Sequence, residues 1–123
     1  MIAADTSSFR RYSTGEHGAD VDAVEAALAS ESLYLPAVVV TELLSDPRPD
    51  ERIVAIIAKI PLLEIRSGYW ARAGVLRATL LQAGHKATVS DTLVAQSCID
   101  HRVPLITHDR DFRHFVKAGL KLL

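Results

Sequence analysis

The chain has 123 residues and a mass of 13.4 kDa, with 49% hydrophobic and 24% charged residues, which is typical of one compact soluble domain rather than two. The formal net charge is −1, so the overall charge gives no argument for a nucleic-acid partner, and any basic surface must be local. The lone cysteine, Cys98, excludes an intrachain disulfide.

The same features predict a cytoplasmic protein. A single cysteine favours a reducing compartment. The N-terminal residues lack the basic region and apolar run of a signal peptide. No apolar stretch approaches the roughly 20 residues that a membrane span requires, so we expect no membrane partner.

Short apolar runs alternate along the chain with segments of helical period, which predicts an α/β domain. The first four candidate strands are residues 2–4, 33–35, 62–65 and 103–106, and residues 120–123 are a candidate fifth strand at the edge. Because strands that alternate with helices pair in parallel, we expect a mostly parallel sheet of four to five strands.

Three segments carry clear helical stripes. The apolar residues at 21, 24 and 28 follow Asp20, which is placed to cap that helix. The isoleucines at 53, 56, 57 and 60 follow a Pro-Asp-Glu sequence that suits a first turn. A stripe from 69 to 83 has Ser67 as a candidate N-cap and Gly84 just past its end.

Two further apolar segments, 36–45 and 88–101, each carry one acid that we place near the start of a helix. In a helix Glu42 lies beside Val38 and Val39, and Asp91 lies beside Val94. An ionised carboxylate next to a core face is costly unless a cation or several donors compensate it. Taken alone, each acid is equally consistent with an ordinary capping or helix-dipole role.

Acidic residues also follow the expected strands. Asp5 comes directly after the first strand, and Asp109 and Asp111 come after the strand at 103–106. Ligands of open α/β sheets bind outside the carboxyl ends of the strands, so Asp5 and Asp109 should lie at the binding edge. For Asp109 and Asp111 the alternative is a solvated turn with local ion pairs.

If Asp5, Glu42, Asp91 and Asp109 converge on one edge, their carboxylates repel one another unless a divalent cation neutralises them. An all-oxygen ligand set favours Mg²⁺ or Mn²⁺ over Zn²⁺. Such a metal stabilises the attacking and leaving oxygens of a phosphodiester and activates water, so phosphodiester cleavage is the natural chemistry.

The sequences around these acids resemble the motifs of PIN-domain ribonucleases. The matching stretches are IAADTS at 2–7, VTEL at 40–43, SDTLVA at 90–95 and THDRDF at 107–112. Their order and spacing fit that family over essentially the whole chain. The length and the uninterrupted single domain further resemble VapC, the toxin family of type II toxin–antitoxin modules. The resemblance implies a PIN-like three-layer α/β/α sandwich, with residues 1–123 forming a single PIN domain.

The resemblance also implies an activity and partners. They are a Mg²⁺- or Mn²⁺-dependent endoribonuclease, an RNA substrate, a cognate VapB-type antitoxin that inhibits it, and a homodimer. Carried over by position, the catalytic and metal-binding acids would be Asp5, Glu42, Asp91 and Asp109. Asp111 would be an accessory or structural acid, and Thr6 and Thr107 would be hydroxyl neighbours that position the acids.

RNA held near a negative site requires cations at its rim. Five cations lie close in sequence to Asp5 or Asp109, and the alternative for each is a solvated helix face: Arg10, Arg11, Arg110, Arg113 and Lys117.

Other functions fit the sequence less well. A receiver-like phosphoacceptor domain requires an Asp at the end of the third strand, where this chain has none. A haloacid-dehalogenase-like phosphatase requires an Asp two residues after its nucleophile, where Ser7 stands. A non-catalytic PIN-like binding module is the remaining alternative, and the four acids argue against it.

Overall fold

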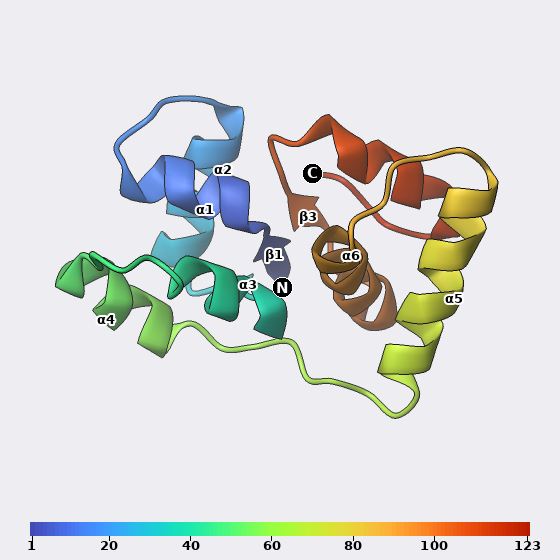
Figure 1. The fold of residues 1–123 in the computed structure, drawn as a ribbon. Coiled ribbons are helices and arrows are strands. Elements are labelled where there is room, and N and C mark those ends of the chain that lie inside the picture. The colour runs from blue at the N-terminus through green and yellow to red at the C-terminus, as the bar shows by residue number, and fades with distance from the viewer.

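A short parallel sheet lies between two groups of helices (Figure 1). The computed structural model describes all residues from 1 to 123. Strand β1 (Ile2–Ala4) is central, with β2 (Leu33–Tyr34) on one side and β3 (Leu105–Ile106) on the other. Both neighbours run parallel to β1, so the carboxyl ends of all three strands meet at one edge. This arrangement confirms the predicted α/β class with a parallel sheet.

The prediction of four to five strands was wrong, because residues 62–65 and 120–123 each add only an isolated bridge, at Leu62 and Leu122. The prolines explain why the ladders stay short. Pro36 ends β2, Pro61 precedes the first bridge and Pro104 precedes β3. A proline has no N–H to donate, so a ladder cannot continue through it.

Four predicted helices are confirmed. They are α2 (Ala19–Ala29), α4 (Glu51–Lys59), α5 (Tyr69–Gln82) and α6 (Val89–His101). Two expected caps shift: Gly18 rather than Asp20 precedes α2, and Gly68, in the left-handed conformation, rather than Ser67 precedes α5. No helix combines the length and the hydrophobicity needed to cross a bilayer.

Three helical elements depart from the sequence analysis. The segment at 36–45 forms a short helix, α3 (Ala37–Leu43), and two elements were not predicted: α1 (Thr6–Ser13) and the 3₁₀ helix η1 (Arg110–Ala118). Both unpredicted elements are mostly polar, and each buries only a small apolar face. Each has an aspartate as its N-cap: Asp5 directly follows β1, and Asp109 lies three residues past the end of β3. The sequence therefore contained the capping aspartate of each helix, but it lacked an apolar stripe long enough to predict a helix.

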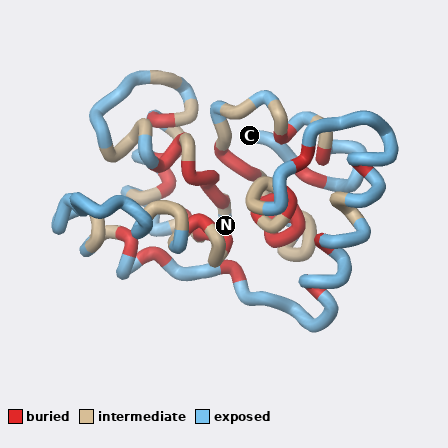
Figure 2. The backbone as a smooth tube through the Cα atoms, viewed as in Figure 1, coloured by how far each residue is buried: buried red, intermediate tan, exposed pale blue.

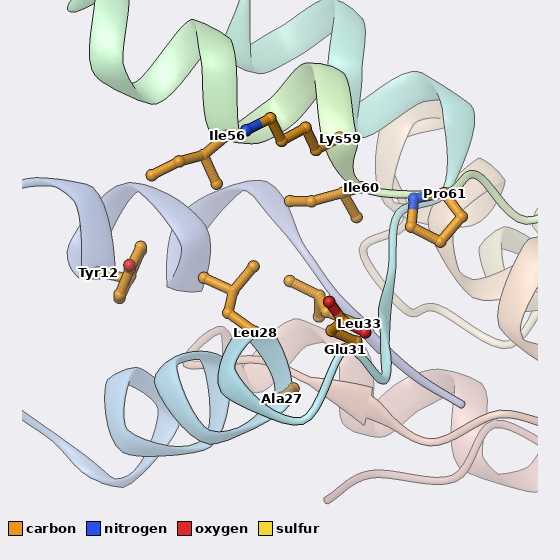
Figure 3. A pocket seen from close by; sticks show the side chains of 9 residues that line it. All are labelled: Tyr12, Ala27, Leu28, Glu31, Leu33, Ile56, Lys59, Ile60 and Pro61. Atoms are coloured by element: carbon orange, nitrogen blue, oxygen red, sulfur yellow. The ribbon is translucent and has the colours of Figure 1, made fainter.

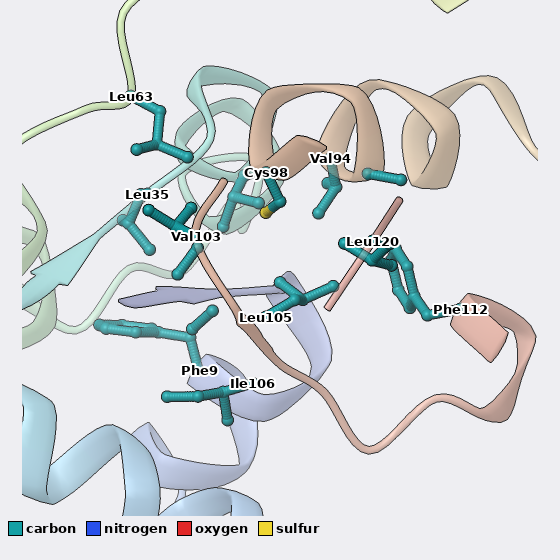
Figure 4. Packing of buried hydrophobic residues seen from close by; sticks show 14 of the residues in the cluster. Phe9, Leu35, Leu63, Val94, Cys98, Val103, Leu105, Ile106, Phe112 and Leu120 are labelled. Carbon is teal, nitrogen blue, oxygen red and sulfur yellow. The ribbon is translucent and has the colours of Figure 1, made fainter. Parts of the chain in front are cut away.

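The core forms where the sheet meets its helices (Figure 2). Phe9 of α1 lies on one side of the strands, while Val94 and Cys98 of α6 lie on the other (Figure 4). Phe112 and Phe115 pack in the same cluster and are buried. Burial raises the pKa of the Cys98 thiol to about 12, so this cysteine is a packing residue and not a thiolate nucleophile.

Phe9 should be among the most costly residues to truncate. Its side chain is 0% exposed, so Phe9→Ala leaves a cavity between α1 and the sheet. We expect the free energy of unfolding to fall by about 3–5 kcal/mol, measured by urea denaturation. Val75→Ala, at a position that is 68% exposed, should stay within about 0.5 kcal/mol of the parent protein. Equal losses in the two variants would contradict this packing.

Candidate metal site

Four acids that are distant in sequence line one pocket at the carboxyl edge of the sheet. The pocket has a volume of about 190 Å³, smaller than the roughly 300–1,000 Å³ of typical organic-ligand pockets. It brings together the four predicted site acids, two hydroxyl residues, one cation and two apolar side chains: Asp5, Glu42, Asp91, Asp109, Thr6, Ser7, Arg10, Val94 and Phe112. Its size suits an ion with its water better than an organic molecule.

Asp5 is the most deeply buried of these acids, with 4% of its surface exposed. It follows β1 and caps α1, accepting a hydrogen bond from the Ser8 backbone N–H at 2.9 Å. The Ser7 hydroxyl lies 2.9 and 3.0 Å from its two oxygens, and the Thr107 hydroxyl donates to Oδ2 at 2.6 Å. Burial raises the pKa of Asp5, and these hydrogen bonds offset only part of that effect. The hydrogen bonds from Ser7, Ser8 and Thr107 hold the Asp5 carboxylate in one orientation.

Glu42 reaches the pocket from the last turn of α3, and not from the start of a helix as we expected. Residues 37–43 form so short a helix that its final turn still lies beside α1. The Thr6 hydroxyl donates to Oε1 of Glu42 at 2.6 Å, and Arg10 donates to the Glu42 backbone carbonyl at 2.9 Å. Two residues of α1 thus hold Glu42 in place.

Asp91 lies in the first turn of α6, directly above the core. Thr88 caps this helix by accepting a hydrogen bond from the Asp91 backbone N–H at 3.0 Å. Partial burial raises the pKa of Asp91 to about 6, and the charges of Asp109, Asp5 and Glu42 add to this effect. The raised pKa of Asp91 therefore reflects, in part, repulsion from the three other acids of the pocket.

Asp109 and Asp111 enter the site through η1. Asp109 caps this helix, and its Oδ1 accepts from the Asp111 backbone N–H at 2.9 Å. Oxygens of Asp91, Asp109 and Asp111 lie within 4.8 Å of one another. Asp111 thus belongs to a tight cluster with two of the predicted acids, although it does not line the pocket itself.

The two predicted threonines act across the chain. Thr6 follows Asp5 but donates to Glu42, while Thr107 precedes Asp109 by two residues but donates to Asp5. Thr107 also accepts from the Asp109 backbone N–H at 3.0 Å. Each hydroxyl therefore ties its own segment to a carboxylate from another one.

The predicted rim cations divide into three kinds. Arg10 lines the pocket. Arg11 is bound by Asp20, Glu16 and the His17 carbonyl, so its guanidinium is already engaged. The three cations of η1 are exposed and do not line the pocket: Arg110, Arg113 and Lys117.

Several contributors were not in the predicted set of site residues. Ser7 and Ser8 donate to Asp5, Thr88 fixes the start of α6, and Val94 and Phe112 form the apolar wall. Ser7 lies two residues after Asp5 in the sequence, so closeness to the acid was an available signal. For Val94 and Phe112 the sequence indicated only a core position.

The donor set is made only of oxygen atoms. The pocket contains neither histidine nor cysteine, and His108 faces Asp20 at 3.9 Å instead. Hard divalent cations such as Mg²⁺ and Mn²⁺ prefer carboxylate, hydroxyl and water oxygens, whereas Zn²⁺ usually takes nitrogen or sulfur. The residues present therefore fit Mg²⁺ or Mn²⁺.

The raised pKa of Asp91 should make metal-free stability depend on pH. The folded state holds this proton up to about pH 6, while the unfolded chain releases it near pH 4, so the contribution of Asp91 to stability falls as pH rises between them. We expect Asp91→Asn to gain stability relative to the parent protein from pH 4 to pH 7. The measurement is urea unfolding in EDTA, and a pH-independent difference would contradict the raised pKa.

Asp100 supplies a control of opposite sign. Burial alone would raise the pKa of Asp100, but hydrogen bonds from Arg72 and Gln96 outweigh burial and lower it. Its contribution is therefore present above pH 4 and is lost as pH falls. Asp100→Asn should lose stability relative to the parent protein near neutral pH, and this loss should shrink toward acid pH.

Removing the Thr107 hydroxyl should loosen two acids at once. Thr107→Val removes one of the donors to the buried Asp5 carboxylate and the acceptor for the Asp109 N–H. We expect a loss of about 1–3 kcal/mol in the free energy of unfolding, measured in EDTA. Thr107→Ser keeps the hydroxyl and should retain most of the stability. Equal stability of the valine and serine variants would show that these hydrogen bonds contribute little.

Comparisons with known proteins identify the family and the fold. The PIN domain family model matches residues 2–118. A search of curated proteins finds no significant match. Among solved structures, the chain is similar to the crystal structure of VapBC2 from Rickettsia felis bound to a DNA fragment from their promoter, with a TM-score of 0.75 and 19% identity over 100% of this chain and 98% of that chain. It is also similar to the crystal structure of FitAcB from Neisseria gonorrhoeae, with a TM-score of 0.71 and 18% identity over 100% and 96% of the two chains.

These structural likenesses concern the fold, whereas the family match covers nearly the whole sequence and contains all the acids of the pocket. This protein belongs to the PIN domain family.

Proposed function

We propose that residues 1–123 form one PIN domain that acts as a metal-dependent endoribonuclease, the VapC-type toxin of a type II toxin–antitoxin pair. The observation that carries this proposal is the convergence of Asp5, Glu42, Asp91 and Asp109 on one small oxygen-lined pocket. Membership of the PIN family supports nuclease chemistry at that pocket.

The acids would hold Mg²⁺ or Mn²⁺. Asp91 and Asp109, which belong both to the pocket and to the tight cluster, would be ligands together with Asp5 and Glu42, and Asp111 would be an accessory acid. A bound divalent cation would stabilise charge on the phosphodiester and lower the pKa of an attacking water.

The protein itself contributes orientation and proton balance. Thr107, Ser7 and the Ser8 N–H hold Asp5, and Thr6 holds Glu42, so these carboxylates need little reorganisation to act. The Asp91 carboxyl keeps a proton below about pH 6 in the metal-free protein. A bound cation would require the ionised carboxylate, so metal affinity should rise with pH through this range.

The proposal includes an antitoxin and a homodimer as partners. An apolar pocket of about 380 Å³ lies between α1, α2 and α4, with Tyr12, Leu28 and Ile56 among its walls (Figure 3). It is a suitable receptor for apolar residues of a VapB-type antitoxin segment, whose basic side chain would neutralise the acids. The similarity of this fold to the VapBC2 and FitAcB structures supports an antitoxin as the partner.

The decisive experiment is cleavage of total cellular RNA by the purified protein, freed of any partner, in Mg²⁺, Mn²⁺ or EDTA. Cleavage should require the metal, and Asp5→Asn or Asp91→Asn should reduce its rate by at least about 100-fold, because changes behind a ligand already cost 10–100-fold. Asp22→Asn, at an exposed position on α2, is the matched control and should cleave normally.

A folded protein that binds Mn²⁺ but cuts no RNA would overturn the enzymatic proposal in favour of a non-catalytic PIN-like binding module. Metal-independent cutting that persists in Asp5→Asn would identify a contaminating nuclease. When cleavage depends on the metal and on Asp5, the fragment ends identify which RNA is the target.

A further inference from the structure

Arg10 occupies a distinctive position between two pockets. It is the only positively charged residue among the nine that line the acidic pocket. It also lines a second pocket of about 410 Å³, enclosed by the ends of α1 and α3, the connection to α4, and α4 itself. Its guanidinium therefore lies at the junction between the acids and a cavity large enough for an organic group.

The second pocket combines apolar walls with polar acceptors, which are the hydroxyls of Ser13, Thr14 and Ser45 and the carboxylates of Asp46 and Asp50. Its apolar residues come from α3, its C-cap and α4, and include Leu43 and Ile53. Ser13 and Thr14 donate to the Arg10 carbonyl, and Ser45 donates to the Thr41 carbonyl. Because these hydroxyls use their hydrogens on the backbone, they present oxygen lone pairs as acceptors. Apolar walls with a few acceptors suit a nucleoside, which has a flat base and N–H or O–H donors.

The Arg10 side chain is anchored but not neutralised. Its Nη2 donates to the Glu42 carbonyl at 2.9 Å, which fixes it relative to a predicted metal ligand. Arg10 is exposed and forms none of the ion pairs in the structure. A guanidinium has five N–H donors, so most of them stay available for an anion.

The other cations lack this combination. Arg11 is engaged by Asp20 and Glu16, while the cations of η1 line neither pocket. Arg48 lines the second pocket but not the acidic one. Only Arg10 can contact both a phosphate near the acids and a group in the second pocket.

We propose that Arg10 binds the phosphate adjoining the scissile one in a single-stranded RNA, and that the second pocket holds the nucleoside attached to it. This inference rests on the proposed nuclease function and adds the direction in which the substrate strand leaves the acids. A cation beside four carboxylates offsets their repulsion of the RNA backbone, and the guanidinium fork matches phosphate oxygens.

Binding of RNA without cleavage tests the inference independently of activity. The probe is a short, fluorescently labelled single-stranded RNA of mixed sequence, titrated with the Asp5→Asn protein in Mg²⁺ at several salt concentrations. In this background Arg10→Gln should raise Kd about tenfold at low salt, as expected for a charge-assisted hydrogen bond to phosphate. The slope of log K against log salt should shrink by about 0.7, the value for one phosphate contact with a single strand.

Two further variants separate charge from pocket. Arg10→Lys keeps the charge but not the fork, so it should retain the salt slope and recover part of the affinity. Ser45→Trp changes an exposed residue and fills the second pocket, so it should weaken RNA binding without changing the salt slope. Lys121→Gln is the matched control, because Lys121 lies beside Leu105 at the start of β3, and it should leave Kd and slope unchanged.

The unfolding midpoint of each variant is compared with that of the parent protein, and a loss of RNA binding counts only where the variant stays folded. In the cleaving protein, Arg10→Gln should raise KM more than it lowers kcat.

Unchanged Kd, salt slope and KM in Arg10→Gln would overturn the inference while leaving the nuclease proposal intact. A protein that binds RNA through Arg10 but does not cleave would leave the inference standing and overturn the nuclease proposal. Loss of antitoxin binding alone in Ser45→Trp would assign the second pocket to a protein partner and overturn its nucleoside role.

Discussion

Repulsion among carboxylates that the fold forces together is the constraint on which the rest of this structure depends. Asp5 is buried, and Asp91 feels the charges of Asp109, Asp5 and Glu42, so both have raised pKa values. A fold does not gain stability from such an arrangement. Its retention at one small pocket is best understood if the pocket binds a divalent cation, which converts mutual repulsion into shared attraction.

The fold reduces this repulsion with helix N-termini and hydroxyl groups. Asp5 and Asp109 are N-caps, and Asp91 lies in the first turn of α6, so all three face the positive end of a helix. Thr6 and Thr107 then connect carboxylates from different segments. The parallel sheet makes this possible because its carboxyl edge is also where the following helices begin. A single edge thus brings strand ends, helix starts and the acids together.

Charge around the pocket is organised on the same principle. Most of the arginines that the structure anchors are held by acids or carbonyls away from the pocket, as Arg11 is by Asp20 and Arg72 by Asp100. Arg10 is held by a backbone carbonyl, and it faces the acids without forming an ion pair with any of them. Although the net charge of the chain is −1, its charges are unevenly placed: an acidic pocket lies next to Arg10, a cation that forms no ion pair.

The sequence by itself determined the α/β class, the four long helices and the set of acids, because amphipathic periods and acids after apolar runs are local signals. Only the tertiary structure decided the short three-stranded sheet, because the apolar runs at 62–65 and 120–123 each make only an isolated bridge to a neighbouring strand. It also decided that α1 is a helix with only a small apolar face, that Glu42 enters from the last turn of α3, and that Asp111 joins Asp91 and Asp109. These features depend on side chains from distant segments meeting at one edge. No local pattern in a single sequence records that meeting, because its energy comes from contacts that exist only after the chain has folded.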